Sequence, residues 1–204
     1  MARRLTTVSF PGLVLAAGSS VRMPGRSKLT RAWSDTTVLG AVLGRAVEAN
    51  LQPLFVACAG SREGMPPDLP FTLVPVSGPE VGRATSLAAG LSAMPEGPVL
   101  VLLGDEPGVR SVNILALIAA WDPSAADMAR IRYADRSGHP VLLGSSARSR
   151  AEELTGDAPI WATLLSEGFV PFELAVDEPA PIDVDSPSDL RRARRKLSTG
   201  RGRA

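Results

Sequence analysis

Two short apolar runs separated by one helical segment constrain the fold of this chain more than any other feature. The first run ends at residue 16 and the second covers residues 53–60. Between them, apolar residues recur at helical spacing over residues 38–47, and Thr36 or Thr37 can cap the start of that helix. A strand, a helix and a strand of these lengths predict a right-handed βαβ unit with parallel strands.

The same alternation continues through the rest of the chain. Strands are expected at residues 71–76, 99–103, 128–133, 138–144 and 169–176, and helices from residue 82 and over residues 112–121, 146–154 and 160–165. Pro75 favours the end of a strand or the edge of the sheet. A hairpin across residues 135–138 would give the sheet one antiparallel strand. The predicted fold class is therefore α/β, with a mostly parallel sheet.

Length and composition limit the classes of protein to consider. A chain of 204 residues with 45% apolar and 21% charged residues is typical of one globular domain. We expect an N-terminal extension over residues 1–10, a domain over residues 11–197, and a disordered basic tail over residues 198–204. Cys58 is the single cysteine, which excludes a disulfide framework.

Charge and hydropathy argue against nucleic acid and membranes as binding partners. The net charge of +1 gives no general field for nucleic acid or an anionic membrane, and the basic residues near the C-terminus suit the exposed face of a last helix. No segment has the roughly 18 apolar residues of a membrane span, and the first ten residues lack the apolar core of a signal peptide. We therefore expect a cytoplasmic protein that binds neither nucleic acid nor membranes.

The loop after the first strand is the first candidate site. Ala16, Ala17 and Gly18 leave little side-chain bulk, so backbone N–H groups up to Ser20 can meet an anion or the edge of a nucleobase. Arg22 and Lys28 add positive charge, and the whole would suit a triphosphate. A simple turn is the alternative interpretation, since neither a Walker A motif nor a Rossmann glycine motif is present.

Carboxylates supply the second candidate site. Asp105 falls at the carboxyl end of the strand 99–103, where open α/β sheets bind ligands, and Mg²⁺ prefers one or two carboxylates together with substrate phosphates. The alternative is a cap for the following helix, although that helix has Ser111 for this purpose. Asp183 and Asp185 alternate with apolar residues, which predicts a strand with both carboxylates on one face. They fit a second contact to the same metal, or an exposed acidic strand end.

Two further places could contact a ligand. Arg83, Thr85 and Ser86 fall at or near a predicted helix N-terminus, which can receive polar ligand atoms but is equally compatible with a simple capped start. His139 is the only histidine. Without a partner histidine or cysteine it is a poor metal ligand, so it is either structural or orients an acceptor by hydrogen bonding.

Six short motifs occur in the order seen in one known family. They are residues 15–23 with 28–29, 82–90, 103–107, 138–141, 154–157 and 183–190. In these motifs the chain resembles molybdenum cofactor cytidylyltransferases of the MobA-like NTP transferase group, over roughly residues 14–197. The resemblance implies a single Rossmann-like three-layer α/β/α nucleotidyltransferase domain. It also implies transfer of a nucleoside monophosphate from CTP to the molybdopterin cofactor, with release of diphosphate.

The resemblance also implies a role for each matching residue. Arg22 and Lys28 would stabilise charge on the phosphates, and Asp105 would bind Mg²⁺ with Asp183 or Asp185 as second carboxylate. His139 would lie near the acceptor. A second group would hold the nucleotide: Leu15, Ala16, Ala17, Gly18, Ser19 and Ser20, with Thr85 and Ser86 near the base or ribose. The implied partners are the NTP, a phosphate-bearing acceptor and a molybdoenzyme under maturation.

Several positions depart from the family pattern. Pro24 is inserted before the approach to Lys28, Glu106 stands where Gln or Met is common, and residues 77–80 match the usual loop poorly. Ala17 in place of a second glycine favours the cytidylyl branch over the guanylyl branch. The alternatives are a related transferase that uses GTP or another NTP with a sugar-phosphate, polyol-phosphate or phospholactate-like acceptor, or a non-catalytic nucleotide-binding accessory protein.

Overall fold

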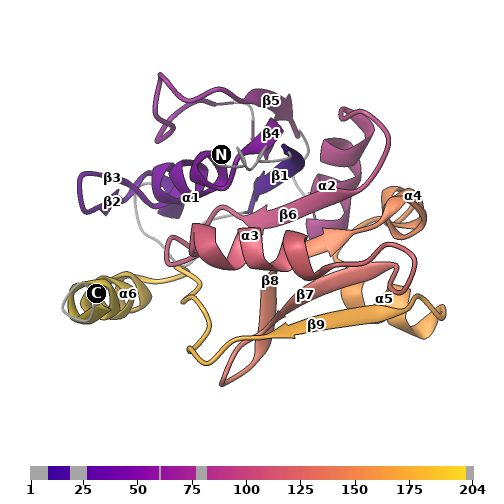
Figure 1. Ribbon diagram of the computed structural model, residues 1–204. Coiled ribbons are helices and arrows are strands. Elements are labelled where there is room, and N and C mark those ends of the chain that lie inside the picture. Colours follow the sequence, from indigo (N-terminus) through magenta and orange to yellow (C-terminus); the bar gives the residue numbers. More distant parts are fainter. Residues whose placement is uncertain (1–8, 19–26, 60, 77–81, 201–204) are drawn as a thin grey trace, which may run out of the picture.

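Seven strands form one twisted sheet at the centre of the protein (Figure 1). The computed structural model describes residues 9–18, 27–59, 61–76 and 82–200. The strand order is β5-β4-β1-β6-β8-β7-β9. The strands are β1 (Phe10–Ala16), β4 (Leu51–Cys58), β5 (Thr72–Pro75), β6 (Val99–Leu103), β7 (Met128–Arg132), β8 (Ser137–Leu143) and β9 (Pro171–Ala175).

The pairing of the strands confirms the predicted sheet. β8 runs antiparallel to both β6 and β7, and the other neighbouring pairs are parallel. β7 and β8 form the expected hairpin, and β5, with Pro75 as its last residue, lies at an edge. β1 lies between β4 and β6, so its carboxyl end opens at the middle of the sheet.

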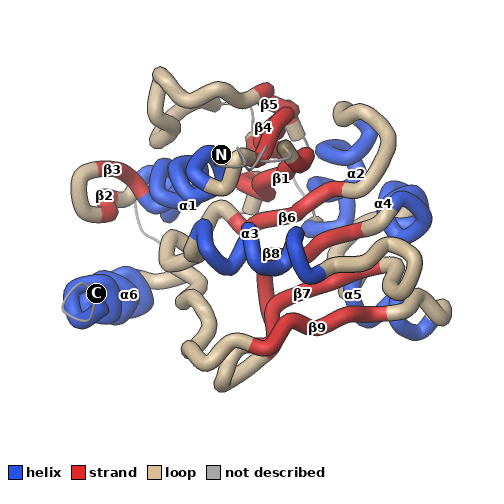
Figure 2. Tube along the Cα trace, viewed as in Figure 1, coloured by secondary structure: helices blue, strands red, loops and turns tan. Residues whose placement is uncertain are grey.

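Helices cover both faces of the sheet and complete three layers (Figure 2). One face carries α1 (Val38–Glu48), α3 (Ser111–Ala120) and α6 (Pro187–Gly200), and the other carries α2 (Arg83–Ser92), α4 (Ser145–Glu152) and α5 (Ile160–Ser166). Two apolar clusters fill the spaces between the layers. Alternation along β1 sends Val14 into the first cluster and Leu13 into the second, and both side chains are fully buried.

Smaller elements connect β1 to the first long helix. A single 3₁₀ turn, η1 (Lys28–Thr30), precedes a two-stranded hairpin of β2 (Ala32–Trp33) and β3 (Thr36–Thr37). The predicted cap of α1 is confirmed, because the Gly40 backbone N–H donates to Thr37 Oγ1 over 2.9 Å.

The last helix, α6, begins with a side-chain cap and a proline. Ser186 Oγ accepts from the backbone N–H of Asp189 over 3.2 Å, and Pro187 takes the first helical position. The helix runs to Gly200. None of the described helices combines the length and the apolar character needed to cross a membrane.

A buried arginine ties two helices together on the second face. Arg148 of α4 is only 4% exposed. Its guanidinium donates to the carbonyl oxygens of Leu91 at 2.7 Å, Met94 at 3.1 Å and Gly97 at 3.0 Å, and also to that of Pro95. These carbonyls end α2 and the turn after it, so one side chain satisfies groups that the helix itself leaves unpaired.

Candidate active site

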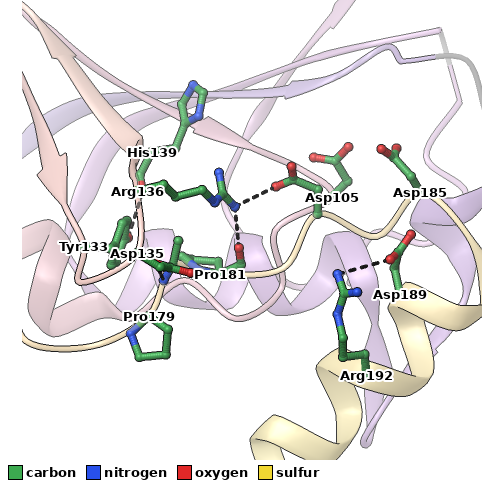
Figure 3. Close-up of polar contacts among 12 residues, drawn as sticks. Asp105, Tyr133, Asp135, Arg136, His139, Pro179, Pro181, Asp185, Asp189 and Arg192 are labelled. Atoms are coloured by element: carbon green, nitrogen blue, oxygen red, sulfur yellow. Dashed lines mark hydrogen bonds and ion pairs between the residues drawn. The ribbon is translucent and has the colours of Figure 1, made fainter.

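A lysine lies between two aspartates at the carboxyl edge of the sheet. Lys28 Nζ is 2.5 Å from Asp105 Oδ2 and 2.7 Å from Asp185 Oδ1. Asp105 follows β6, Asp185 precedes α6, and Lys28 begins η1, so three distant segments meet at one ammonium group. Figure 3 shows the two aspartates beside each other. Lys28 and Asp105 therefore meet at this edge of the sheet.

Backbone contacts hold these segments in place. The Gly104 N–H donates to the Leu15 carbonyl and the Val184 N–H to the Asp105 carbonyl, each over 2.9 Å. A Cβ at Gly104 would lie 3.1 Å from the Leu15 carbonyl oxygen, so a larger residue would push β1 and the β6 loop apart. The end of β1 and the loop before α6 are thus both fixed to the residues that carry Asp105.

The expected strand around residues 182–185 is not formed. Residues 181–185 make an extended loop, because the segment approaches the end of β6 through the Val184 bond rather than lying along a neighbouring strand. The two aspartates contact different groups. Asp185 reaches Lys28, while Asp183 accepts from Arg136 over 3.4 Å. Of the two alternatives in the sequence, Asp185 is therefore the one that shares a cation with Asp105.

The charges at this site support one another. Burial by itself would lower the pKa of the Lys28 ammonium, but the carboxylates of Asp105 and Asp185 raise it above its ordinary value. Lys28 is consequently a cation at neutral pH, although only 7% of it is exposed. The aspartate oxygens converge on a point that already holds a positive charge.

The donor set fits a divalent cation bound together with a substrate. Two carboxylates aimed at one point suit Mg²⁺, which keeps its other positions for water and phosphate oxygens. Among the described residues, no group of three or more His, Cys, Asp or Glu side chains could hold a metal ion. A cation at Asp105 and Asp185 would therefore need phosphate oxygens or water as further ligands.

A buried glutamate next to Asp105 was missed as a site residue in the sequence analysis. Glu106 is 2% exposed, and within the described part of the chain its Oε2 atom has no hydrogen-bond partner. Burial, followed by the nearby carboxyls of Asp183 and Asp105, raises the pKa of Glu106 well above its ordinary value. The only signal in the sequence was a second acidic residue directly after Asp105 at the end of a strand.

His139 lies on β8 at an irregularity in the strand. Ile131 pairs with Gly138 and the preceding Arg130 pairs with Val141, so His139 and its neighbour form a bulge. Burial lowers the pKa of the His139 imidazole to about 4, and nearby arginines contribute in the same direction. His139 is therefore neutral at pH 7. In Figure 3, the guanidinium of Arg136 extends from below His139 toward the side of the site that carries the aspartates.

The loop residues on β1 emerge beside Asp105. Leu15 pairs with Leu103 in the parallel register of β1 and β6, so Ala16, Ala17 and Gly18 continue next to the end of β6. Gly18 is exposed to solvent. The remaining predicted nucleotide-binding and catalytic residues of this loop, Ser19, Ser20 and Arg22, lie outside the described residues.

The N-terminus of α2 is closed by another part of the chain. The Ala84 N–H donates to the Gly156 carbonyl over 3.0 Å, and the Gly156 N–H donates to Thr85 Oγ1 over 3.0 Å. Ser86 Oγ donates to the Gly82 carbonyl over 3.2 Å. Both hydroxyls named in the sequence analysis are thus used within the protein, and a nucleotide-binding role for Thr85 and Ser86 stays a prediction.

A cavity of about 680 Å³ opens beside Asp185. Its walls come from the β7–β8 hairpin, the loop before α6 and α6 itself, and they carry both acidic and basic side chains. The lining includes Asp135, Arg136, Asp183, Asp185, Asp189, Arg192 and Lys196. This volume is in the range of sites for small molecules.

Comparison with known proteins agrees with this geometry. The sequence matches the MobA-like NTP transferase domain family over residues 12–168. Rv0371c from Mycobacterium tuberculosis H37Rv is 33% identical, with a TM-score of 0.80 over 93% of this chain and 100% of that one. A second structure, of Rv0371c in complex with manganese, is 31% identical, with a TM-score of 0.74 over 92% and 99% of the two chains.

A more distant structure shares the fold alone. A nucleotidyl transferase from Methanothermobacter thermautotroptrophicus is 19% identical, with a TM-score of 0.76 over 94% of this chain and 99% of that chain. No match is found among curated proteins. The fold is therefore the Rossmann-like nucleotidyltransferase fold expected from the motifs.

Proposed function

Because the chain belongs to the MobA-like NTP transferase domain family, we propose that it transfers a nucleoside monophosphate from an NTP to a phosphate-bearing acceptor. The observation that supports this most directly is the convergence of Lys28, Asp105 and Asp185 beside the end of β1. This arrangement places a cation for phosphates and two carboxylates for a metal next to the β1 loop, whose small residues let a nucleotide approach the backbone closely.

Each residue has a defined part in the proposed reaction. Asp105 and Asp185 would hold Mg²⁺, which when bound supplies positive charge to the phosphate oxygens. Lys28, together with Arg22, stabilises the charge that grows on the departing diphosphate. An oxygen of the acceptor phosphate attacks the α-phosphorus in line, and the bond from that phosphorus to the bridging oxygen of the β-phosphate breaks. No nucleophile from the protein is required.

The position of β6 suggests where the two substrates lie. β6 is next to β1, and the cavity is lined by Asp185, which shares Lys28 with Asp105. A nucleotide on the β1 loop and an acceptor in the cavity would then meet at the Asp105–Asp185 pair. The neutral imidazole of His139 can donate a hydrogen bond to the acceptor substrate, or accept one from it, without adding charge to the site.

The finer assignment is CTP as donor and the molybdopterin cofactor as acceptor. Support for it comes from the resemblance of the six motifs and from Ala17 in the β1 loop. A molybdoenzyme under maturation would then receive the product, in the cytoplasm. Transfer from GTP or another NTP to a sugar-phosphate, polyol-phosphate or phospholactate-like acceptor is the alternative that uses the same residues.

Diphosphate release with each of the four common NTPs, Mg²⁺ and a panel of phosphate-bearing acceptors tests this proposal. Asp105→Asn should lower turnover by several orders of magnitude, whereas Asp68→Asn, the same change at an exposed residue, should leave it unchanged. The nucleotide that is used should also stabilise the fold by about 2.7 kcal/mol at a hundredfold excess over its Kd. Stabilisation without turnover, unaffected by Asp105→Asn, would indicate a non-catalytic binding protein instead.

A further inference from the structure

Lys28 occupies the point at which a divalent cation would bind. Its ammonium nitrogen is 2.5 Å and 2.7 Å from the two aspartate oxygens that the proposed function assigns to Mg²⁺. Magnesium–oxygen distances are about 2.0–2.1 Å, so a metal ion on these oxygens would lie almost where the nitrogen now lies. The ammonium group and the metal ion cannot share this point.

Displacement of Lys28 by a metal ion alone would be unfavourable. The side chain is largely buried, and a buried ammonium separated from its carboxylate partners would be left without compensating charge. The metal would also gain only two protein carboxylates at this point. A nucleotide changes both conditions, because its phosphates give Lys28 new anionic partners and give the metal additional oxygen ligands.

We propose that the Lys28 ammonium competes with the divalent cation for the carboxylates of Asp105 and Asp185. It occupies this pair until metal and nucleotide bind together. The inference rests on the proposed function and adds to it a coupling between the two ligands. Coupling of this kind is reciprocal, so nucleotide tightens metal binding by the factor by which metal tightens nucleotide binding. The competing group comes from η1, directly after the loop that would hold the nucleotide.

The side chain of Lys28 is suited to such an exchange. It is a flexible four-carbon chain carrying a compact charge, so it can move from carboxylates to phosphates by changing rotamers. The backbone of η1 can stay in place meanwhile, since it is held by Ser27, whose carbonyl accepts the Thr30 N–H over 3.2 Å.

Mn²⁺ binding without nucleotide, measured by the electron paramagnetic resonance of the free ion, tests the proposal. Lys28→Met should bind Mn²⁺ roughly tenfold or more tightly than the wild type, because the competing cation is gone. Arg45→Met is the control, since it removes an exposed cation that pairs with Glu48 on α1, and it should bind Mn²⁺ as the wild type does. Lys28→Met/Asp105→Asn should lose the gained affinity.

A non-hydrolysable NTP analogue supplies the second readout. It should tighten Mn²⁺ binding to the wild type by a larger factor than to Lys28→Met, whose metal site is already open. Lys28→Gln, which keeps a polar donor near the carboxylates, provides the same comparison if Lys28→Met does not fold. Equal or weaker Mn²⁺ affinity of the folded Lys28 variant would overturn the inference. No Mn²⁺ binding by any variant, with or without the analogue, would overturn the proposed function as well.

Discussion

Replacing Arg148 with Met should destabilise the protein far more than any surface arginine would. The guanidinium reaches the carbonyl oxygens of Leu91, Met94, Pro95 and Gly97, and it is also 3.1 Å from Glu152 Oε1. Each buried carbonyl left without a donor costs about 1–3 kcal/mol, and water entering at the end of α2 will recover part of that cost. We expect a loss of about 3–5 kcal/mol, against a typical total of about 5–15 kcal/mol.

Urea unfolding followed by circular dichroism measures this loss, and thermal unfolding should show a Tm lower by roughly 6–20 °C. Arg150→Met on the same helix is the control. Arg150 pairs with Glu153 and Glu167 at the surface, so its removal should cost about 0–1 kcal/mol. If Arg148→Met costs no more than Arg150→Met, the four carbonyls do not depend on the guanidinium and the reasoning is wrong.

Three further predictions concern residues near the site. Glu106→Gln should gain stability relative to the wild type in urea as pH rises from about 5 to 8, because a raised pKa in the folded state makes the glutamate's contribution fall as pH increases. His139→Asn should lose less stability than the wild type between pH 6.5 and 4, because the folded protein disfavours the imidazolium; an unchanged pH profile would contradict this. Ser186→Ala should cost about 1 kcal/mol of unfolding free energy by loss of the α6 cap, whereas Ser188→Ala, at an exposed neighbour, should cost less.

The parts of the fold that depend on local sequence patterns, such as apolar runs and helix caps, could be predicted from the sequence. β1, β4 and β6 are apolar runs, and the caps Thr37 and Ser186 stand directly before helical periodicity. The meeting of Lys28 and Asp105 was also predictable, because each follows a strand of one parallel sheet and such ends share an edge.

The parts that depend on long-range contacts could not be predicted. Nothing near Gly156 indicates that its backbone closes the start of α2, and nothing near Arg148 indicates that its side chain closes the end. Alternating apolar and acidic residues before α6 suggested a strand, but an extended loop with one bond to Asp105 satisfies the same pattern. The burial of Glu106 likewise arises from segments that are distant in the sequence.

The separation of the three charged residues along the chain affects when the protein acquires its chemistry. Lys28 is 77 residues from Asp105 and 157 residues from Asp185. Every strand of the seven-stranded sheet precedes Asp185 in the chain, so the last acidic partner is synthesised after all of them. Contacts of such high sequence separation form late and slowly, so newly made molecules will be compact before they are competent.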